Sequence, residues 1–478
     1  MKKVRRILTT TLKVLGYLLL TILIGLLLSV LISKKDYNDP TAPIGAKLKA
    51  VALRNAHIIP MQEDTLQIIT GHTLLIDRGI ILDILPDSVE IPARFKRIDL
   101  NGKYVLPGLI DMHSHIFDRS DLPMYLGYGV TTVRNMMGFP MHLRWRDQIN
   151  KGAYPGARLI TATPTINEGS NTSPFHKNID SAEEAANAVR KYKEEGYDFI
   201  KIYDGLTLSQ FKAIMREAKK AGLKVAGHPP HDIDLDTLLN YPINTYEHIE
   251  EVVQGMMDYK LDTVHGRKIA KKLKKHQAKI TVTLSPFHAI YKTTTEGTPF
   301  LENIPTDQIN PFVRFIGNRQ LQQWVNANEG TYEWNVKKYE CMEALVRIFD
   351  EEGVTMLLGT DTGPNLTIPG LTLHNEIALL AKNGLTPHSI LRSGTANAAK
   401  ALGLEKELGT IAVGKKAELL VVEQNPLEQL KTLKHPHMIL TQDIFYDQEA
   451  IVALRDLGRN KAYTYTTIGR FLDHLLQK

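Results

Sequence analysis

The chain has 478 residues, 43% of them hydrophobic and 23% charged, so it can bury the core of one large domain or of two to three ordinary ones. Its formal net charge is +6, but the basic run at residues 267–276 contains no aromatic residue and is typical of a solvated helix face, so nucleic-acid binding is not predicted. Cys341 is the single cysteine, which excludes an intramolecular disulfide and a cysteine-based zinc ribbon. Any metal must therefore be held by histidines and carboxylates.

An apolar segment near the N-terminus predicts a membrane anchor over residues 1–35. Residues 14–33 include no charged residue, and roughly 20 residues at 1.5 Å each span about 30 Å, the thickness of a hydrocarbon core. The run is longer than the apolar core of a signal peptide and no Ala-x-Ala site follows it, so an uncleaved single-pass helix is favoured over a cleaved signal or a buried helix. The basic residues before it place the N-terminus in the cytoplasm. The rest of the chain would then be periplasmic or extracellular.

After a polar linker at residues 36–49, short β-rich runs alternate with turns. These runs lie at residues 51–59, 66–69, 73–77, 79–85 and 97–100. Similar short β-rich runs occur again at residues 408–413 and 417–422. We expect residues 50–104 and 405–467 to join into one small β-sandwich domain, followed by a C-terminal helix at residues 468–478.

Between these segments, strand-type and helix-type runs alternate, which predicts an α/β fold. Helical patterns with end signals cover residues 181–195 and 209–221. The predicted strands begin with the run from Val105 to His115 and continue at residues 131–135, 158–165, 199–203, 224–227, 245–249, 279–284 and 355–359. Eight such units over residues 105–404 suit a (β/α)8 TIM barrel, which takes roughly 250 residues. Residues 296–340 are predicted to be an insertion that forms a lid.

Ligand-type residues stand at the ends of several predicted strands. His113 and His115 are two residues apart, so a strand would aim both imidazoles to the same side. His228, His248 and Asp361 follow the fifth, sixth and eighth strands, and Lys201 lies in the fourth. Any one of these histidines is more often a structural residue than a ligand, and Asp361 alone could cap a turn. Because the ends of barrel strands meet at one rim, the whole set favours a metal site.

Lys201 is the unusual member of this set. A buried lysine on an apolar strand is costly unless it is paired or neutralised. Reaction of its amine with carbon dioxide would give a carbamate, a carboxylate-like group able to bridge two metal ions.

These residues, in this order, resemble the amidohydrolase superfamily. The resemblance covers about residues 51–426. It rests on Pro107-Gly-Leu-Ile-Asp-Met-His-Ser-His115, on Gly359-Thr-Asp361, on Gly394-Thr-Ala-Asn-Ala-Ala and on the segment at residues 408–422. Ala417-Glu418 departs from the family's usual Ala-Asp, outside the site. The lysine pattern is similar to that of the binuclear branch with imidazolonepropionase-like and Xaa-Pro-dipeptidase-like members.

The resemblance implies a specific metal arrangement and mechanism. His113, His115 and Asp361 would hold one ion, His228 and His248 a second, and carbamylated Lys201 would bridge them. Two divalent ions are expected, zinc by default, although manganese or cobalt would also suit such ligands. A metal-activated hydroxide would attack a carbonyl, and Asp361 would take and deliver the proton.

The expected function is hydrolysis of a C–N bond in an amide, cyclic amide or dipeptide. Tyr203, His176, His231 and His288 are candidate substrate-binding residues in the loops after the strands, although each is individually more often structural. Ester or lactone hydrolysis at the same site, and a non-catalytic membrane-tethered binding protein, remain as alternatives. The sequence leaves the exact substrate and the oligomeric state open.

Overall fold

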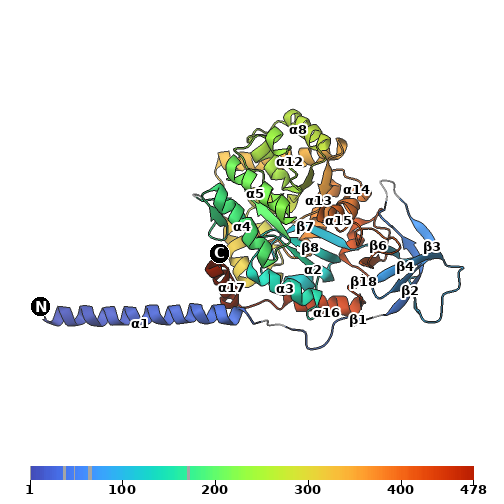
Figure 1. Cartoon of the computed structure of the whole chain (residues 1–478), viewed down its shortest axis with the longest axis horizontal. Coiled ribbons are helices and arrows are strands. Elements are labelled where there is room, and N and C mark those ends of the chain that lie inside the picture. Colours follow the sequence, from blue (N-terminus) through green and yellow to red (C-terminus); the bar gives the residue numbers. More distant parts are fainter. Residues whose placement is uncertain (1, 36–38, 48, 63–66, 170–172, 478) are drawn as a thin grey trace.

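The computed structural model describes residues 2–35, 39–47, 49–62, 67–169 and 173–477. Within them the protein is an α/β molecule from which one long N-terminal helix, α1 (Lys2–Ser33), projects (Figure 1). By length and composition, Arg6–Ser33 is apolar enough to cross a membrane, with a mean hydropathy of 2.7. The leucines and isoleucines of α1 stand exposed along most of its length, whereas Ser29, Val30 and Ser33 near its end are buried.

The body contains two sheets of parallel strands. The first has the order β7 (Leu109–Ser114), β8 (Val130–Asn135) and β9 (Arg158–Thr161). The second has the order β11 (Lys177–Ile179), β10 (Ile166–Glu168), β12 (Phe199–Ile202), β13 (Lys224–Gly227), β14 (Thr245–Glu247), β15 (Lys279–Thr281) and β16 (Thr355–Leu357). The eight strands predicted from the sequence are therefore confirmed as β7 to β9 and β12 to β16.

Hydrogen bonds also join the two sheets to each other, next to β9 and β12 and next to β7 and β16. On one side the Thr163 amide donates to the Phe199 carbonyl at 2.9 Å, next to a parallel bridge between Ala162 and Phe199. On the other side the Met112 amide donates to the Leu358 carbonyl at 2.9 Å, and Ser114 forms a parallel bridge with Thr362. The parallel pairings place the carboxyl ends of these strands on one side of the molecule.

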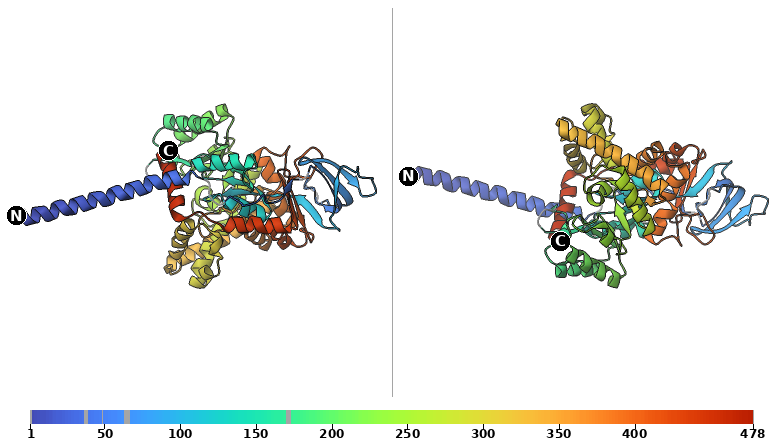
Figure 2. Two further views of the ribbon diagram at one scale, coloured as in Figure 1. Left: turned by 90° about the horizontal axis from the view of Figure 1, so that it is seen from below. Right: turned by 90° about the horizontal axis from the view of Figure 1, so that it is seen from above.

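A separate mixed sheet combines both ends of the chain. Its path is β1 (Ala46–Lys47), β19 (Ile444–Tyr446), β18 (Met438–Thr441), β17 (Leu419–Val422), β6 (Tyr104–Pro107), β2 (Ala50–Ile58), β3 (Ile69–Asp77) and β4 (Ile80–Pro86), with β5 (Lys96–Asp99) paired to β2. The antiparallel β6–β17 pair connects the early segment to the late one. Figure 2 shows this sheet at the end of the body far from α1.

Helices cover the parallel strands. They are α2 (Asp121–Gly127), α3 (Pro140–Asn150), α4 (Ala182–Glu195), α5 (Leu208–Ala221), α6 (Leu235–Leu238), α7 (Ile249–Glu251), α8 (Thr263–Lys275), α9 (Leu284–Glu296), α10 (Thr298–Glu302), α11 (Pro311–Gln322), α12 (Glu329–Glu351), α13 (Leu371–Lys382), α14 (Pro387–Ser393), α15 (Ala396–Leu402), α16 (Gln448–Arg459) and α17 (Thr464–Gln477). The predicted helices at residues 181–195 and 209–221 are confirmed as α4 and α5. Ser181 caps α4 by accepting a bond from the Glu184 amide, and Gly222 ends α5 in the left-handed conformation.

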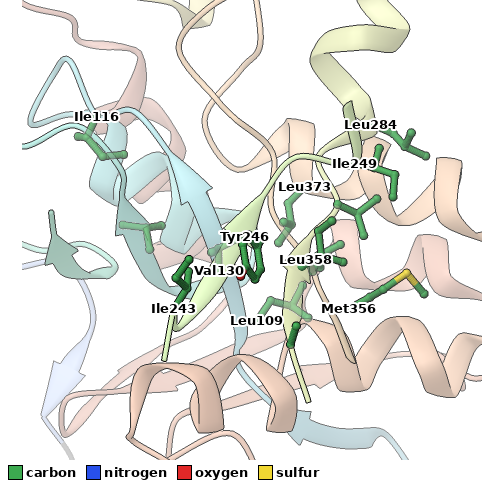
Figure 3. Close-up of a cluster of buried hydrophobic side chains, with 14 of the residues drawn as sticks. Leu109, Ile116, Val130, Ile243, Tyr246, Ile249, Leu284, Met356, Leu358 and Leu373 are labelled. Carbon is green, nitrogen blue, oxygen red and sulfur yellow. The ribbon is translucent and has the colours of Figure 1, made fainter. Parts of the chain in front are cut away.

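The main core lies between the parallel strands and their helices. Figure 3 shows Leu109, Val130, Tyr246, Met356 and Leu358 from the strand region packed with residues of the loops and helices around it. Strands β7, β8 and β12 are buried along their whole length, and the polar residues that they contain, such as Asp111, Arg134 and Lys201, are buried with them. The core therefore fixes the strand ends that carry the polar residues described below.

Several segments differ from the sequence expectation. The single run predicted from Val105 splits at Gly108 into β6 and β7, because β6 pairs with β17 in the mixed sheet whereas β7 pairs with β8 in a parallel sheet. Residues 408–413 form no strand, and α16 occupies part of the segment assigned to the β domain. The C-terminal helix begins at Thr464 rather than at residue 468, while residue 478 lies outside the described residues, as do linker residues 36–38 and 48 and the predicted strand residue 66.

Candidate metal centre

His113 and His115 come together with Asp361 at the carboxyl end of β7. The Nε2 atoms of His113 and His115 lie 3.3 and 2.9 Å from Asp361 Oδ1. One ligand atom from each of the three residues falls within 4.8 Å of the others. The alternation of the strand thus gives the predicted result, with both imidazoles on the same side.

The backbone at Asp361 is held in an uncommon conformation. Its φ angle is 51°, in the left-handed region that non-glycine residues rarely adopt, and its amide donates to the His113 carbonyl at 2.7 Å. The neighbouring Thr360 hydroxyl donates to buried Asp111 at 2.6 Å. Left-handed φ angles also occur at His248 and Thr283 in the same region. Such strain persists where surrounding contacts enforce it, and it is common at functional sites.

A buried carboxylate orients His113. Glu247 Oε2 lies 2.8 Å from His113 Nδ1, and its other oxygen accepts a bond from Arg134 at 2.8 Å. Although burial alone would raise it, the charge of Arg134 and the contact with His113 hold the pKa of Glu247 well below its usual value. A neutral imidazole carries one proton, yet His113 faces a carboxylate oxygen at each ring nitrogen. Only one of these two contacts can therefore be a hydrogen bond from neutral His113. A cation bound by both Nε2 and Asp361 would account for the other contact.

His228 and His248 form a second pair beside this cluster. The ring of His248 lies 4.3 Å from the ring of His113 and 4.8 Å from that of His228. The Nδ1 atom of His248 hydrogen-bonds the Thr283 hydroxyl at 2.6 Å, and Nδ1 of His228 lies 3.0 Å from Glu251. Partners at Nδ1 leave the Nε2 atoms as potential ligands, which is the usual arrangement around a protein-bound metal.

Lys201 is buried in β12 beside these histidines. Its side chain lines the same cavity, and Nζ has no hydrogen-bond partner among the described residues. Burial lowers the pKa of Lys201 to about 8, although Glu247 and Asp361 favour the charged form. A more readily neutralised, unpartnered amine suits the reaction with carbon dioxide expected from the sequence.

The protonation states of the histidines and of Asp361 also favour metal binding over ion pairing among these residues. Burial lowers the pKa values of His115 and His248, so both imidazoles are neutral at neutral pH. Although burial opposes it, hydrogen bonds from His113 and His115 hold the pKa of Asp361 well below its usual value, so this carboxyl is ionised. Neutral imidazoles and an ionised carboxylate are the forms that bind a divalent cation, so the residues present fit a metal site.

Two of the four predicted substrate-binding residues line the cavity above the cluster. The cavity has a volume of about 540 Å³ and includes Tyr203 and His176, with Tyr203 stacked on His228 at 4.1 Å between ring centroids. His231 and His288 are not among its lining residues. His231 instead contacts Glu251 at 2.7 Å, and His288 packs beside Tyr339, so the structure separates both from the cavity.

The supporting residues were not predicted from the sequence. Glu247, Glu251 and Thr283 act through the histidines they contact, and the signal for the two glutamates was their position beside His248 in Tyr-Glu-His-Ile-Glu-Glu. The predicted lid segment forms α10, α11 and part of α12, and α11 supplies Phe312, Val313, Ile316 and Gln320 to the cavity wall.

The fold and this cluster define an α/β protein with a partly buried His-His-Asp site able to hold metal. A model of the amidohydrolase family matches residues 104–449. The 5-methylthioadenosine/S-adenosylhomocysteine deaminase of Teredinibacter turnerae is 30% identical over 434 residues, which is 80% of this chain and 88% of the relative. The chain therefore belongs to the amidohydrolase family, as its motifs predicted.

The neighbours agree with the predicted branch. Imidazolonepropionase of Geobacillus kaustophilus is 22% identical over 405 residues, 77% of this chain and 87% of the relative. The crystal structure of a Xaa-Pro dipeptidase with bound methionine superposes with a TM-score of 0.65 and 21% identity, covering 84% of this chain and 100% of that one. Some relatives match over a short stretch: the chain spans only 21% of a Moorella thermoacetica deaminase and 18% of Aspergillus niger ochratoxinase.

Proposed function

We propose that this protein is a metal-dependent hydrolase of C–N bonds in amides, cyclic amides or dipeptides. The observation that carries the proposal is the cluster of buried His113 with partly buried His115 and Asp361, whose ligand atoms lie within 4.8 Å of one another. Family membership supports the same reaction class. The two parallel sheets, joined to each other at two places, support a closed (β/α)8 barrel, and the mixed sheet, with residues 50–104 and 405–467, supports a flanking β-sandwich domain.

The proposed site holds two divalent ions, zinc by default. His113, His115 and Asp361 would bind one ion, His228 and His248 the other, and Lys201 as a carbamate would bridge them. When bound, such ions lower the pKa of water and polarise a carbonyl. Imidazole and carboxylate donors suit zinc, manganese or cobalt.

In the reaction, a water oxygen bonds to the carbonyl carbon and the C–N bond breaks. Asp361 accepts the proton that the water loses and passes it to the leaving nitrogen, which departs as an amine while the carbonyl side becomes a carboxylic acid. The low pKa of Asp361 keeps this oxygen ionised before the reaction. Tyr203, at the cavity wall beside His228, would donate its hydroxyl to the carbonyl oxygen, and His176, whose ring lies next to that of Tyr203, would contact the substrate beyond it.

The apolar helix gives the proposed enzyme a location. Residues 6–33 would cross the membrane once, with the basic N-terminus in the cytoplasm and the catalytic domain outside, in the periplasm or extracellular space. Its substrate would be a small molecule or dipeptide available on that side.

A hydrolysis screen with the full chain in detergent tests the proposal. Dipeptides, cyclic amides and lactones are supplied with zinc, and release of the amine or acid is measured. We expect C–N hydrolysis that Asp361→Asn lowers by at least about 10³-fold, since that change removes both a ligand and the base. Asp258→Asn, on an exposed turn, is the matched control and should retain activity.

Cleavage of lactones alone would replace the amide assignment with ester hydrolysis. Tight ligand binding without turnover of any compound would favour the binding protein and contradict the enzyme.

A further inference from the structure

The cavity beside His113, His115 and Asp361 has many apolar lining residues. Its apolar wall is made up of the side chains of Phe117, Phe175, Phe287, Phe312, Ile316 and Phe471, of which Phe117 and Phe287 also lie next to the ligand residues His115 and His248. Ile316 is also 41% exposed, so it lies at the rim where the cavity meets solvent. This hydrocarbon surface can cover an apolar part of a substrate.

Helix α17 is central to this wall. The ring of Phe471 lies 4.8 Å from Phe175, 5.5 Å from Phe312 and 5.7 Å from Phe117, measured between ring centroids. These four rings come from four separate segments of the chain. They form a continuous aromatic surface in contact with the cavity.

The same helix carries the end of α1. Gly469 packs so closely on α1 that a Cβ there would lie 2.1 Å from the Ser29 carbonyl oxygen. Lys34 pairs with Asp473 at 3.1 Å, and Asp39, just beyond, pairs with Arg119 at 2.6 Å. In Figures 1 and 2 α17 lies across the inner end of α1. The helix proposed to cross the membrane is therefore fixed to the cavity wall through two consecutive turns of α17.

Exposed apolar residues stand at both ends of α17 and on the neighbouring helix α11. Tyr463, just before α17, is 72% exposed, and Leu476 at its end is 73% exposed. On α11, which packs against α17, Phe315 is 58% exposed and neighbours Ile316 at the cavity rim. Tyrosines next to leucine and phenylalanine are typical of protein surfaces that rest at a membrane interface.

We propose that the cavity opens at the membrane surface and accepts an amphiphilic amide whose hydrocarbon chain enters from the lipid. The amide group would reach the metal cluster, and the chain would lie along Phe312, Phe471 and Ile316. The patch formed by Tyr463, Tyr465, Phe315 and Leu476 would rest on the lipid headgroups. This inference rests on the proposed C–N hydrolase function and adds the substrate class.

The first test compares N-acyl glycines with acyl chains of two, eight and fourteen carbons, using the full chain in detergent. We expect kcat/KM to rise by about threefold per added CH2 group until the apolar wall is covered. Equal or falling kcat/KM with chain length would overturn the substrate class while leaving the hydrolase function intact. Absence of hydrolysis of all N-acyl glycines and of every compound in the wider screen would instead overturn the proposed function.

The second test addresses entry from the lipid. The fourteen-carbon substrate is presented in phosphatidylcholine vesicles that also hold the enzyme. Phe315→Glu, outside the cavity, should lower the rate by at least about fivefold in vesicles but leave the rate in detergent unchanged, because it places a charge at the lipid contact. Val264→Glu, at an exposed position of α8, is the matched control and should have no effect on the rate in either medium. An unchanged vesicle rate for Phe315→Glu would contradict entry from the membrane.

Discussion

At the scale of single residues, the buried carboxylate of Glu247 connects two functions. It holds the Nδ1 side of His113 and balances the buried charge of Arg134. Metal-binding histidines commonly depend on such a partner for ring orientation and basicity. Glu247 is thus a positioning residue, since it contacts His113 and acts on the proposed metal site only by orienting that histidine.

We predict that Glu247→Gln lowers metal affinity by about 10- to 100-fold. The amide keeps the shape but loses the charge that aligns His113. Competition with a chelator measures the affinity, and thermal unfolding reports the cost of leaving Arg134 without its carboxylate. Glu423→Gln, at a 56% exposed side chain, controls for the same substitution. Equal metal affinity in the two variants would remove Glu247 from the account.

How far the site could be predicted depends on the kind of residue. His113, His115, His228, His248 and Asp361 follow apolar strand runs, and strand periodicity is visible in a single sequence. The contact of Arg134 with Glu247, or of His248 with Thr283, arises only when separate strands meet, so no local pattern reveals it. For the same reason, no local pattern showed that His231 and His288 do not line the cavity, and His288 lies in α9 rather than in the predicted loop.

At the scale of elements, α17 joins the apolar helix to the cavity. Its start was predicted four residues late, because the amphipathic pattern is weak over the Thr464-Tyr-Thr-Thr turn. Helix α16 was missed because short β runs before it suggested one continuous β segment. The insertion at residues 296–340 was predicted to form a lid. Its contribution of Phe312 and Ile316 to the cavity wall depends on the packing of α11 against α17, which the sequence does not show.

The α1–α17 contact makes a prediction about Gly469. In a helix interior, Gly→Ala normally stabilises by up to about 1 kcal/mol. At Gly469 the added methyl would overlap the Ser29 carbonyl, so Gly469→Ala should instead destabilise the contact by roughly 1–3 kcal/mol. Thermal unfolding and protease cleavage between residues 34 and 47 measure the effect. Gly330→Ala, with only an ordinary contact at α12, should be neutral or stabilising; the same response at both glycines would contradict a tight α1–α17 contact.

At the scale of the whole molecule, the proposed membrane span of α1 would determine on which side of the membrane the reaction takes place. The chain offers a simple probe because its single cysteine, Cys341, is buried. We predict that Asp258→Cys, at an 82% exposed side chain, reacts with a membrane-impermeant maleimide in intact cells. Lys3→Cys should react only after permeabilisation, since the basic N-terminus is expected in the cytoplasm. The reverse pattern would place the catalytic domain inside.

Strand order and the separation of the two kinds of sheet could be predicted because their patterns are long and regular. The joining of residues 50–107 and 419–446 in one sheet was expected, because short β-rich runs occur near both ends of the chain. The register of β6 against β17 could not be predicted from either segment alone. The docking of α1 on the body was equally invisible, because Ser29 and Ser33 are ordinary residues of an apolar helix until Gly469 lies against them.

The measurement that tests the central claim most directly is metal content per chain, determined by elemental analysis on the sample used for hydrolysis. The account predicts two divalent ions per chain with activity, and loss of at least one ion together with activity in Lys201→Ala, partly restored by a short carboxylic acid. Full activity without bound metal would contradict the account, and unchanged metal content in Lys201→Ala would contradict the bridging role of Lys201.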